Sequence, residues 1–396
     1  MRGTADPPAA TAPATDTAIA AVLAGRSVRP VFQPVVDLAT RAVVGVEALA
    51  RGPAGTALEF PDALFTAARA AGRLGELDLL CTERALECAL AAPVRPPLLF
   101  INAEPAVLSQ PLSPRLIELA AGGLPFRYVL EFTERALPAA PASLLHIAGV
   151  VHQWGNGLAL DDVGVDPMSL AFLPVLEPEV IKLDMGLVRN PHAPHTQEVC
   201  AVVRAEAART GAVVLAEGIE SDDDLRTARS LGAHWGQGWL FGRPGRIDGG
   251  AHRYDSAAAG VLGAPRPDFH QPAGTPFHVA AGHGPVTTGT AETVAAALTR
   301  MRETVTGTES AVVVLSRPDT GVPGITADLW QLADRTRSVI TLDQPVPGEF
   351  AAVVIGPGHG YALCVRPGAA AAFEMVAGEK IPLIAAVARV LLNRHR

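Results

Sequence analysis

The chain has 396 residues, of which 49% are hydrophobic and 18% are charged, and its formal net charge is −8. An acidic chain without a basic run does not coat nucleic acid nonspecifically, and no run of about 18 apolar residues predicts a membrane span. Four irregularly spaced cysteines, at positions 81, 88, 200 and 364, exclude a disulfide framework or a zinc site. Because an apolar signal core is also missing near the amino terminus, we expect a cytoplasmic protein.

The first part of the chain alternates between strand and helix patterns. Residues 1–17 are rich in Ala, Pro and Thr and predict a flexible tail. Strands are predicted over residues 31–33, 41–46, 97–101, 128–130, 158–160, 180–184, 212–216 and 236–241. Helices are predicted over residues 61–71, 76–92, 114–121, 142–154 and 196–210. Eight strands separated by helices indicate an α/β fold, a TIM-like (β/α)8 barrel over residues 18–252.

A second and smaller unit follows. Frequent Gly and Pro over residues 253–274 predict a linker, and residues 275–396 have the pattern of a small α/β sensory domain. Its predicted elements are helices over 290–305, 326–337 and 382–393, strands over 310–315 and 339–342, and a β-hairpin of 351–355 with 361–365. The sequence GPGHG at 356–360 lacks the lysine of a phosphate loop, and we expect it to be the longer loop of that hairpin.

Acidic or amide residues stand where the predicted barrel strands end. They are Glu47, Asn102, Glu131, Asp161, Asp162 and Glu217. The carboxyl ends of barrel strands converge on one mouth, so these oxygens are expected to meet there. Carboxylates crowded together without a cation repel one another and raise each other's pKa, which makes a solvated acidic rim the weaker interpretation. The pattern therefore favours a site for hard divalent cations.

The sequence around these residues resembles a known family. Glu47-Ala48-Leu49 with Arg51 follows Phe32-Gln33-Pro34, and the motifs FINAEP, LEFTE, LALDDVG, IKLD, AEGIE and GQGWLFGRP follow in order. Over roughly residues 28–245, this series resembles the EAL family of cyclic di-GMP phosphodiesterases. The resemblance implies a cytoplasmic bacterial enzyme of second-messenger signalling. Its reaction would be the hydrolysis of cyclic di-GMP to linear pGpG with two ions, Mg²⁺ or Mn²⁺.

The resemblance also implies roles for single residues. Glu47, Asn102, Glu131 and Asp161 would hold one ion, with Asp161 bridging, Asp162 on the second ion and Glu217 completing the cluster. Lys182, Glu217, Asp162 and Gln237 are the expected catalytic residues, and Lys182 would orient the attacking water. Gln33, Leu49 and Arg51 are the expected substrate-binding residues, with Leu49 against a guanine.

Arg51 has a planar fork of donors that matches phosphate oxygens, although an Arg four residues after Glu47 also has the spacing to form an ion pair with it. The histidines at 146, 152, 192, 195 and 234 fall away from the strand ends and receive no role.

One segment departs from the family. After the paired aspartates, Val163–Met168 carries Asp166-Pro167 in place of a flexible glycine sequence, which restricts the loop. Glu134, which matches the anchor of this loop, is retained, and Glu104 adds an acid near the mouth.

Two functions from different classes stay open. One is an active phosphodiesterase, and the other is a catalytically weak or inactive cyclic di-GMP receptor that signals through its carboxyl-terminal domain. That domain loosely resembles the DICT type of sensory domain, with an unknown signal or partner. A homodimer through the barrel is a further possibility that the family implies. No partner membrane or nucleic-acid polymer is expected.

Overall fold

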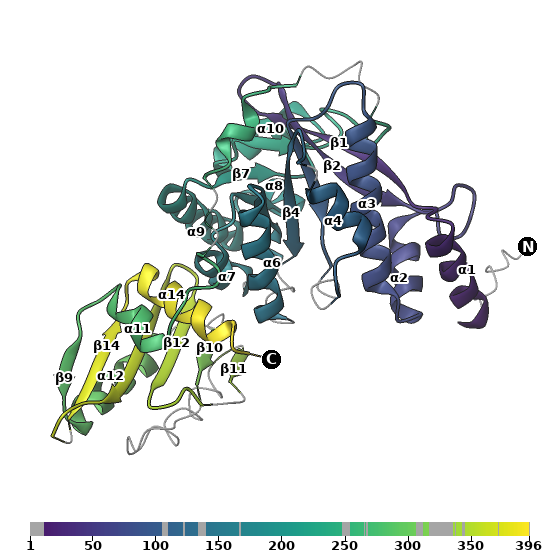
Figure 1. The fold of residues 1–396 in the computed structure, drawn as a ribbon. Helices are drawn as coiled ribbons and strands as arrows, with labels where there is room; N and C mark the ends of the chain where they lie inside the picture. The colour runs from purple at the N-terminus through teal and green to yellow at the C-terminus, as the bar shows by residue number, and fades with distance from the viewer. Residues whose placement is uncertain are drawn as a thin grey trace, which may run out of the picture.

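The computed structural model describes residues 12–104, 110–121, 123–133, 140–165, 168–247, 254–264, 266, 268–305, 312–316, 336, 338–342, 345–370 and 372–395. These residues form a closed eight-stranded barrel and a separate six-stranded sheet, as Figure 1 shows. The predicted α/β class and barrel are confirmed. Glu134 lies outside the described residues, as do Asp166 and Pro167.

All eight predicted barrel strands are present. They are β1 (Arg29–Asp37), β2 (Val43–Arg51), β3 (Leu98–Asn102), β4 (Arg127–Thr133), β5 (Gly157–Val163), β6 (Val180–Leu183), β7 (Val213–Ala216) and β8 (Trp235–Gln237). β1 pairs antiparallel with both β2 and β8, whereas the other neighbours are parallel. A turn in which Asp37 Oδ1 accepts the N–H groups of Ala39 and Thr40 joins β1 to β2. So short a connection permits only an antiparallel pair, and it places Gln33 opposite Glu47.

Helices surround the barrel. Their bounds are α1 (Ala12–Ala24), α2 (Pro61–Ala70), α3 (Leu74–Ala91), α4 (Pro114–Ala121), α6 (Pro141–Gln153), α7 (Met168–Leu176), α8 (Met185–Arg189), α9 (Pro194–Thr210) and α10 (Asp222–Leu231). Helix α1 includes the last residues of the expected tail, and α7, α8 and α10 were not predicted. Helix α7 is apolar along nearly its whole length, so it has no 3.6-residue periodicity to detect.

Side chains that point into the barrel are apolar in the first part of the strands and polar at their carboxyl ends. Because side chains alternate along a strand, every second residue points into the barrel. In five strands, an apolar interior residue is followed two positions later by a polar one: Val129 by Glu131, Ala159 by Asp161, Val180 by Lys182, Leu215 by Glu217 and Trp235 by Gln237. The lower end is closed by the short 3-10 helix η2 (Ala258–Val261) and by Leu262, which belong to the expected linker. Arg127 holds this segment by donating to the carbonyls of Ala259 and Leu262.

The second unit is a sheet with helices on both faces. Its strands are β9 (Thr287–Gly289), β10 (Val312–Leu315), β11 (Ser338–Thr341), β12 (Phe350–Gly356), β13 (His359–Pro367) and β14 (Phe373–Gly378), in the order β11-β10-β12-β13-β14-β9. Its helices are α11 (Pro276–Ala281), α12 (Ala291–Val305) and α14 (Ile381–Leu392). The longer hairpin loop expected at 356–360 is wrong, because Gly356 pairs with His359 and leaves a two-residue turn. The helix predicted over 326–337 falls almost wholly outside the described residues.

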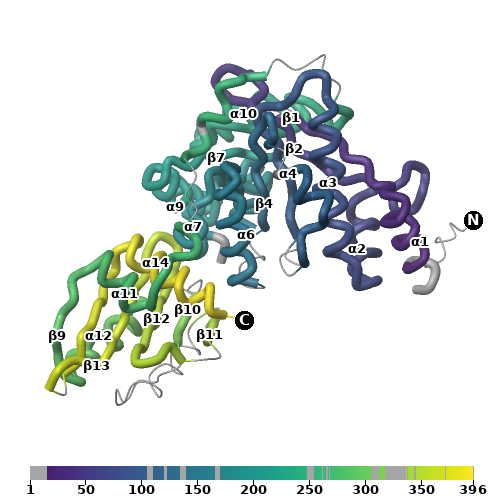
Figure 2. The backbone as a smooth tube through the Cα atoms, in the orientation of Figure 1, coloured from purple at the N-terminus to yellow at the C-terminus, as the bar shows by residue number. Residues whose placement is uncertain are grey.

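The two units share a hydrophobic core. Helix α12 packs on one face of the sheet, and α11 and α14 pack on the other face, which is turned toward the barrel (Figure 1). Helix α14 also contacts α7 and α6, and Figure 2 shows α14 beside α7. Leu173 of α7 and Leu383 of α14 belong to one buried cluster. The sheet domain is therefore docked on the barrel through α7.

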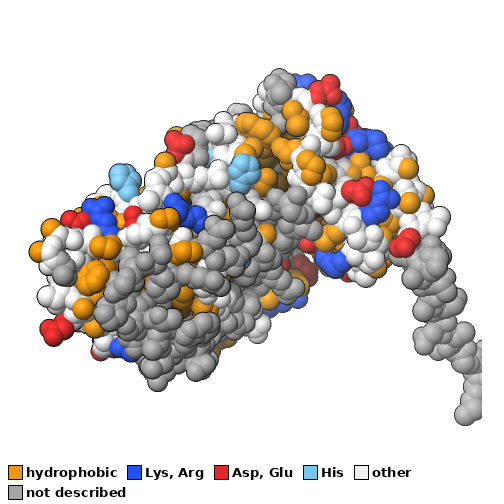
Figure 3. Space-filling model, turned by 60° about the horizontal axis from the view of Figure 1, so that its bottom comes forward, with side chains coloured by type: hydrophobic (Ala, Val, Ile, Leu, Met, Phe, Trp, Pro, Cys, Tyr) orange, Lys and Arg blue, Asp and Glu red, His pale blue; other side chains and the backbone are white. Residues whose placement is uncertain are grey.

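The surface carries mixed charge. On the face shown in Figure 3, blue and red side chains are interspersed among apolar ones. Within the part of the chain that the structure describes, none of the helices combines the length and apolar character that crossing a membrane requires.

Candidate active site

Lys182 lies at the centre of the barrel mouth. Its Nζ is 3.0 Å from Glu131 Oε1, 3.1 Å from Asp161 Oδ1, 2.8 Å from Glu217 Oε1 and 3.9 Å from Glu47 Oε2. These carboxylates come from β4, β5, the end of β7 and β2. The structure thus brings together acids that are up to 170 residues apart in the sequence, as their strand-end positions predict.

Glu47 is fixed by two amides. Its Oε1 accepts a hydrogen bond from Asn102 Nδ2 at 2.8 Å, and its Oε2 accepts one from Gln237 Nε2 at 2.7 Å. Gln237 also donates to Gln33 Oε1 at 3.2 Å, so Gln33 belongs to this chain of hydrogen bonds. Glu47 lies inside β2 rather than at its end, because pairing with β1 continues to Arg51. Its side chain is therefore held rigidly by β2 and by amides from β3 and β8.

The paired aspartates lie at an irregularity between strands. The register of β5 against β6 shifts between Leu160 and Val163, and Asp162 has a positive φ of 55°. The Asp162 N–H donates to Asp161 Oδ1 at 2.9 Å. This turn directs both side chains to the same side: oxygens of Asp161, Asp162 and Glu217 all lie within 4.8 Å of one another. That spacing suits one cation held by three carboxylates.

Burial and mutual charge determine protonation at the mouth. Burial raises the pKa of Glu131 well above its ordinary value, and burial raises the pKa of Glu217 to about 8. Burial by itself would lower the pKa of Lys182, but the carboxylates of Asp161, Glu131 and Glu217 outweigh it and hold that pKa well above its usual value. Lys182 therefore stays an ammonium, which excludes it as a general base.

The donor set fits divalent cations. Glu131 Oε2 and Gln237 Oε1 are buried without a hydrogen-bond partner among the described residues. Four carboxyl groups, those of Glu47, Glu131, Asp161 and Glu217, lie within 3.9 Å of the single Lys182 ammonium, so acidic groups outnumber the cation at their centre. Hard oxygen donors with unsatisfied lone pairs and an excess of acidic groups are what Mg²⁺ or Mn²⁺ requires.

A cavity of about 610 Å³ opens beside the carboxylates. Glu47, Asn102 and Glu131 line its inner end, and Leu49 and Arg51 line its wall. Residues 47, 49 and 51 share one face of β2 because strand side chains alternate. Arg51 Nη1 donates to the carbonyl of Ala50 at 2.7 Å, so the guanidinium faces the cavity instead of pairing with Glu47.

Three more residues line the site; of these, Glu104 was expected near the mouth from the sequence, whereas Arg69 and Asp78 were not found. Arg69 of α2, Asp78 of α3 and Glu104 after β3 line the same cavity. Asp78 is 2% exposed, and burial raises its pKa to about 8. An acid on the apolar face of a helix, between Leu77 and Leu80, was the available signal. His195 received no role from the sequence, yet its Nε2 bonds the Gly164 carbonyl at 2.8 Å, next to the Asp162 turn.

Comparisons with known proteins identify the family of the barrel. The model of the EAL domain family matches residues 17–244. The probable cyclic di-GMP phosphodiesterase PdeB of Escherichia coli (strain K12) is 31% identical over 224 residues, which cover 54% of this chain and 42% of PdeB. The cyclic di-GMP phosphodiesterase RocR of Pseudomonas aeruginosa is 36% identical over 121 residues, which cover 30% of this chain and 31% of RocR.

A solved structure has the same fold. The EAL domain of Xanthomonas citri FimX, in complex with c-diGMP, superposes with a TM-score of 0.52 at 20% identity and covers 59% of this chain and 94% of its own. The matched segment spans less than half of the length of PdeB or RocR, so their whole-protein properties do not transfer directly. Because the family model covers more than half of the sequence, this chain belongs to the EAL domain family.

Proposed function

We propose that this protein hydrolyses cyclic di-GMP to linear pGpG with the aid of two divalent ions, Mg²⁺ or Mn²⁺. The observation that carries the proposal is the convergence of Glu47, Glu131, Asp161 and Glu217 around Lys182, beside a cavity that contains Arg51. A protein that only bound the nucleotide would have no chemical need for this arrangement.

The proposed role of each residue follows from its position in the site. Glu47, Asn102, Glu131 and Asp161 would hold one ion, and Asp161, Asp162 and Glu217 the other. Bound divalent ions lower the pKa of the attacking water and stabilise charge on the phosphoryl oxygens. Lys182 orients that water and offsets the same charge from within the cluster. Gln237 and Gln33 keep Glu47 in position through the hydrogen bonds described above.

The substrate would lie along the wall of the cavity. Arg51 presents its guanidinium fork to a phosphate, and Leu49, two residues before it on the same face of β2, packs against a guanine. The carboxylates at the inner end then face the scissile phosphodiester. In this proposal a base, a phosphate and the reacting group would lie in that order along the cavity.

The test is hydrolysis of cyclic di-GMP in Mg²⁺ or Mn²⁺, followed by chromatography, with Glu47→Gln as the inactive variant. Glutamine keeps the shape of Glu47 but removes its charge, so it separates the loss of a ligand from a loss of packing. Glu206→Gln is the matched control, because Glu206 is equally buried but lies on α9 and pairs with Arg209. If the parent and Glu206→Gln form pGpG and Glu47→Gln does not, the result supports the phosphodiesterase. Tight binding without product would favour the receptor.

The carboxyl-terminal domain has a regulatory role in this proposal. Residues 275–396 would receive a signal in the manner of a DICT-type domain and pass it to the barrel through α7, on which α14 packs. Calorimetric titration with candidate ligands, followed by the rate of hydrolysis, tests this role. The proposed homodimer is tested by the mass of the particle in solution.

A further inference from the structure

The outer end of the active-site cavity is lined by ionisable side chains. Arg69 from α2, Asp78 from α3 and Glu104 from the segment after β3 line it, together with Arg51 on β2. Arg69 Nη2 is 3.6 Å from Glu104 Oε1, which is too long for a hydrogen bond. Both groups therefore keep donors and acceptors that are available to a ligand.

Glu104 has a defined place relative to the metal ligands. It follows Asn102 by two residues, so in an extended chain both side chains point to the same side, about 6.6 Å apart. Its N–H donates to Asp78 Oδ2 at 3.2 Å, and Asp78 is itself buried in α3. Asp78 thus fixes the backbone that presents Glu104 to the cavity.

We infer that Glu104 and Arg69 form a base-reading pair that selects guanine over adenine at the outer end of the cavity. This inference rests on the proposed function and adds residues that determine its substrate specificity. The Watson–Crick edge of guanine offers N1–H and N2–H donors beside the O6 acceptor. A carboxylate accepts from both donors, and a neighbouring guanidinium donates to O6, which adenine lacks. Glu104 and Arg69 lie beside each other in the cavity lining, with Arg69 Nη2 and Glu104 Oε1 3.6 Å apart.

Adenine presents the opposite pattern. Its N6 amino group is a donor, but its N1 is an acceptor and faces the carboxylate lone pairs of Glu104 without a proton between them. A site built for one set of hydrogen bonds rejects a ligand that leaves its polar groups unpaired. A glutamine amide, in contrast, donates and accepts side by side and matches adenine.

The experiment compares cyclic di-GMP with cyclic di-AMP in the parent, Glu104→Gln and Arg69→Met. Dissociation constants are measured by calorimetry in Ca²⁺, and KM and kcat in Mn²⁺. We expect the parent to favour cyclic di-GMP, and Glu104→Gln to weaken cyclic di-GMP about tenfold while it strengthens cyclic di-AMP. Arg69→Met should weaken cyclic di-GMP alone, and its effect on KM should exceed its effect on kcat. Only direct hydrogen bonding to the base makes a substitution change the affinities for the two nucleotides in opposite directions, as expected for Glu104→Gln.

Matched controls come from Arg300 and Glu379, an exposed pair 3.7 Å apart in the other domain, substituted as Arg300→Met and Glu379→Gln. Unchanged affinities in Glu104→Gln and Arg69→Met, in a parent that hydrolyses cyclic di-GMP, would overturn the base-reading pair and leave the proposed function standing. A parent that binds cyclic di-GMP without hydrolysis, with the expected shifts in the variants, would support the pair and refute the enzyme. A parent that binds neither nucleotide overturns both.

Discussion

Arg389 of the carboxyl-terminal domain lies 3.5 Å from Glu177 of the barrel, and only 5% of Arg389 is exposed. Its Nε and Nη2 also donate to the carbonyls of Val175 and Pro174, at 2.8 and 2.7 Å. His270 bonds the next carbonyl, that of Leu176. The last carbonyls of α7 are therefore satisfied by residues from beyond the barrel. The amino end of α7 follows the Asp162 turn, so one helix connects the docked domain to the site.

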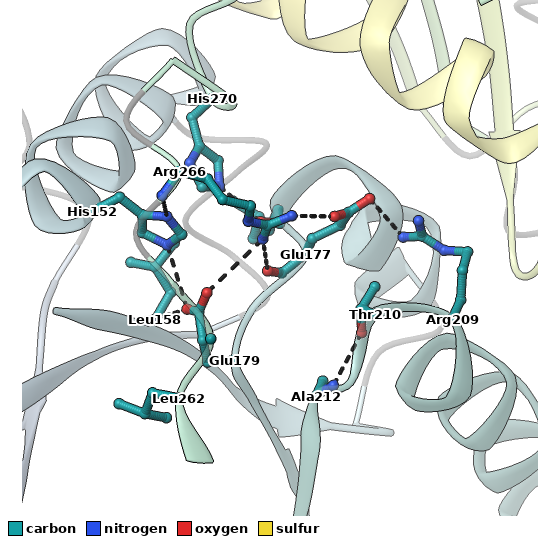
Figure 4. A network of polar contacts seen from close by, with 12 residues as sticks. His152, Leu158, Glu177, Glu179, Arg209, Thr210, Ala212, Leu262, Arg266 and His270 are labelled. Carbon is teal, nitrogen blue, oxygen red and sulfur yellow. Dashed lines mark hydrogen bonds and ion pairs between the residues drawn. The ribbon is translucent and has the colours of Figure 1, made fainter. Parts of the chain in front are cut away.

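Figure 4 shows the rest of this network. Glu177 forms ion pairs with Arg266 and Arg209, at 2.5 and 2.8 Å. Arg266 also extends toward Glu179, which lies beside His152. Three arginines thus share Glu177, which keeps its pKa below the ordinary value even though burial, the largest effect, raises it. A carboxylate held in this way is a rigid attachment point for both α7 and the linker segment.

We predict that Arg389→Met destabilises the protein by about 3 kcal/mol, because it leaves two helix carbonyls and part of the Glu177 charge buried without a partner. Urea denaturation followed by fluorescence measures the change. Arg300→Met on the exposed face of α12 is the control and should shift stability by less than about 0.5 kcal/mol. Equal shifts in the two variants would show that the buried contacts contribute nothing.

The positions of the acids at the barrel mouth could be predicted from the sequence because strand alternation determines them. A polar residue two positions after an apolar interior one, as in Ala159 and Asp161, must point to the mouth. Asp78 could not be placed there, because its position depends on how α3 packs beside β3, whereas Glu104 was expected near the mouth because it follows Asn102 closely. Helix α7 was missed because an apolar helix with Pro174 has no amphipathic pattern. The antiparallel pairing of β1 with β8 depends on ring closure, which no local pattern encodes.

Removal of Lys182 should affect stability in a manner that depends on metal. Lys182→Met leaves the carboxylates of Glu131, Asp161 and Glu217 without their ammonium, so we expect a lower melting temperature in EDTA and recovery in Mn²⁺. Hydrolysis should fall at least about 100-fold even with Mn²⁺ present. Differential scanning fluorimetry with and without Mn²⁺ makes the comparison. An unchanged melting temperature in EDTA would contradict the repulsion that the cluster implies.

Asp78 should make stability depend on pH. Burial raises its folded-state pKa to about 8, whereas the pKa of an unfolded aspartate is about 4. Between these values the folded protein keeps a proton that the unfolded chain releases, so this group lowers stability as pH rises from about 4 to 8. Asp78→Asn removes the titration but keeps an acceptor for the Glu104 N–H. Urea denaturation at pH 5, 6.5 and 8 should give a flatter profile for the variant, and parallel profiles would refute the neutral Asp78.

Gly164 should be irreplaceable for the second metal site. It has a φ of 108°, which alanine rarely adopts, and a Cβ there would lie 2.7 Å from Leu187 Cδ1, so alanine strains the turn after Asp162 and requires the Leu187 side chain to move. We expect Gly164→Ala to weaken the second of two Mn²⁺ binding events in calorimetry and to lower kcat about tenfold or more. Gly155→Ala is the control, because Gly155 also has a positive φ, 75°, but open space around it. It should cost about 1 kcal/mol of stability and leave Mn²⁺ binding intact. If both variants lost metal equally, backbone strain alone would explain the result, and the contact with Leu187 would have no part in holding the Asp162 turn.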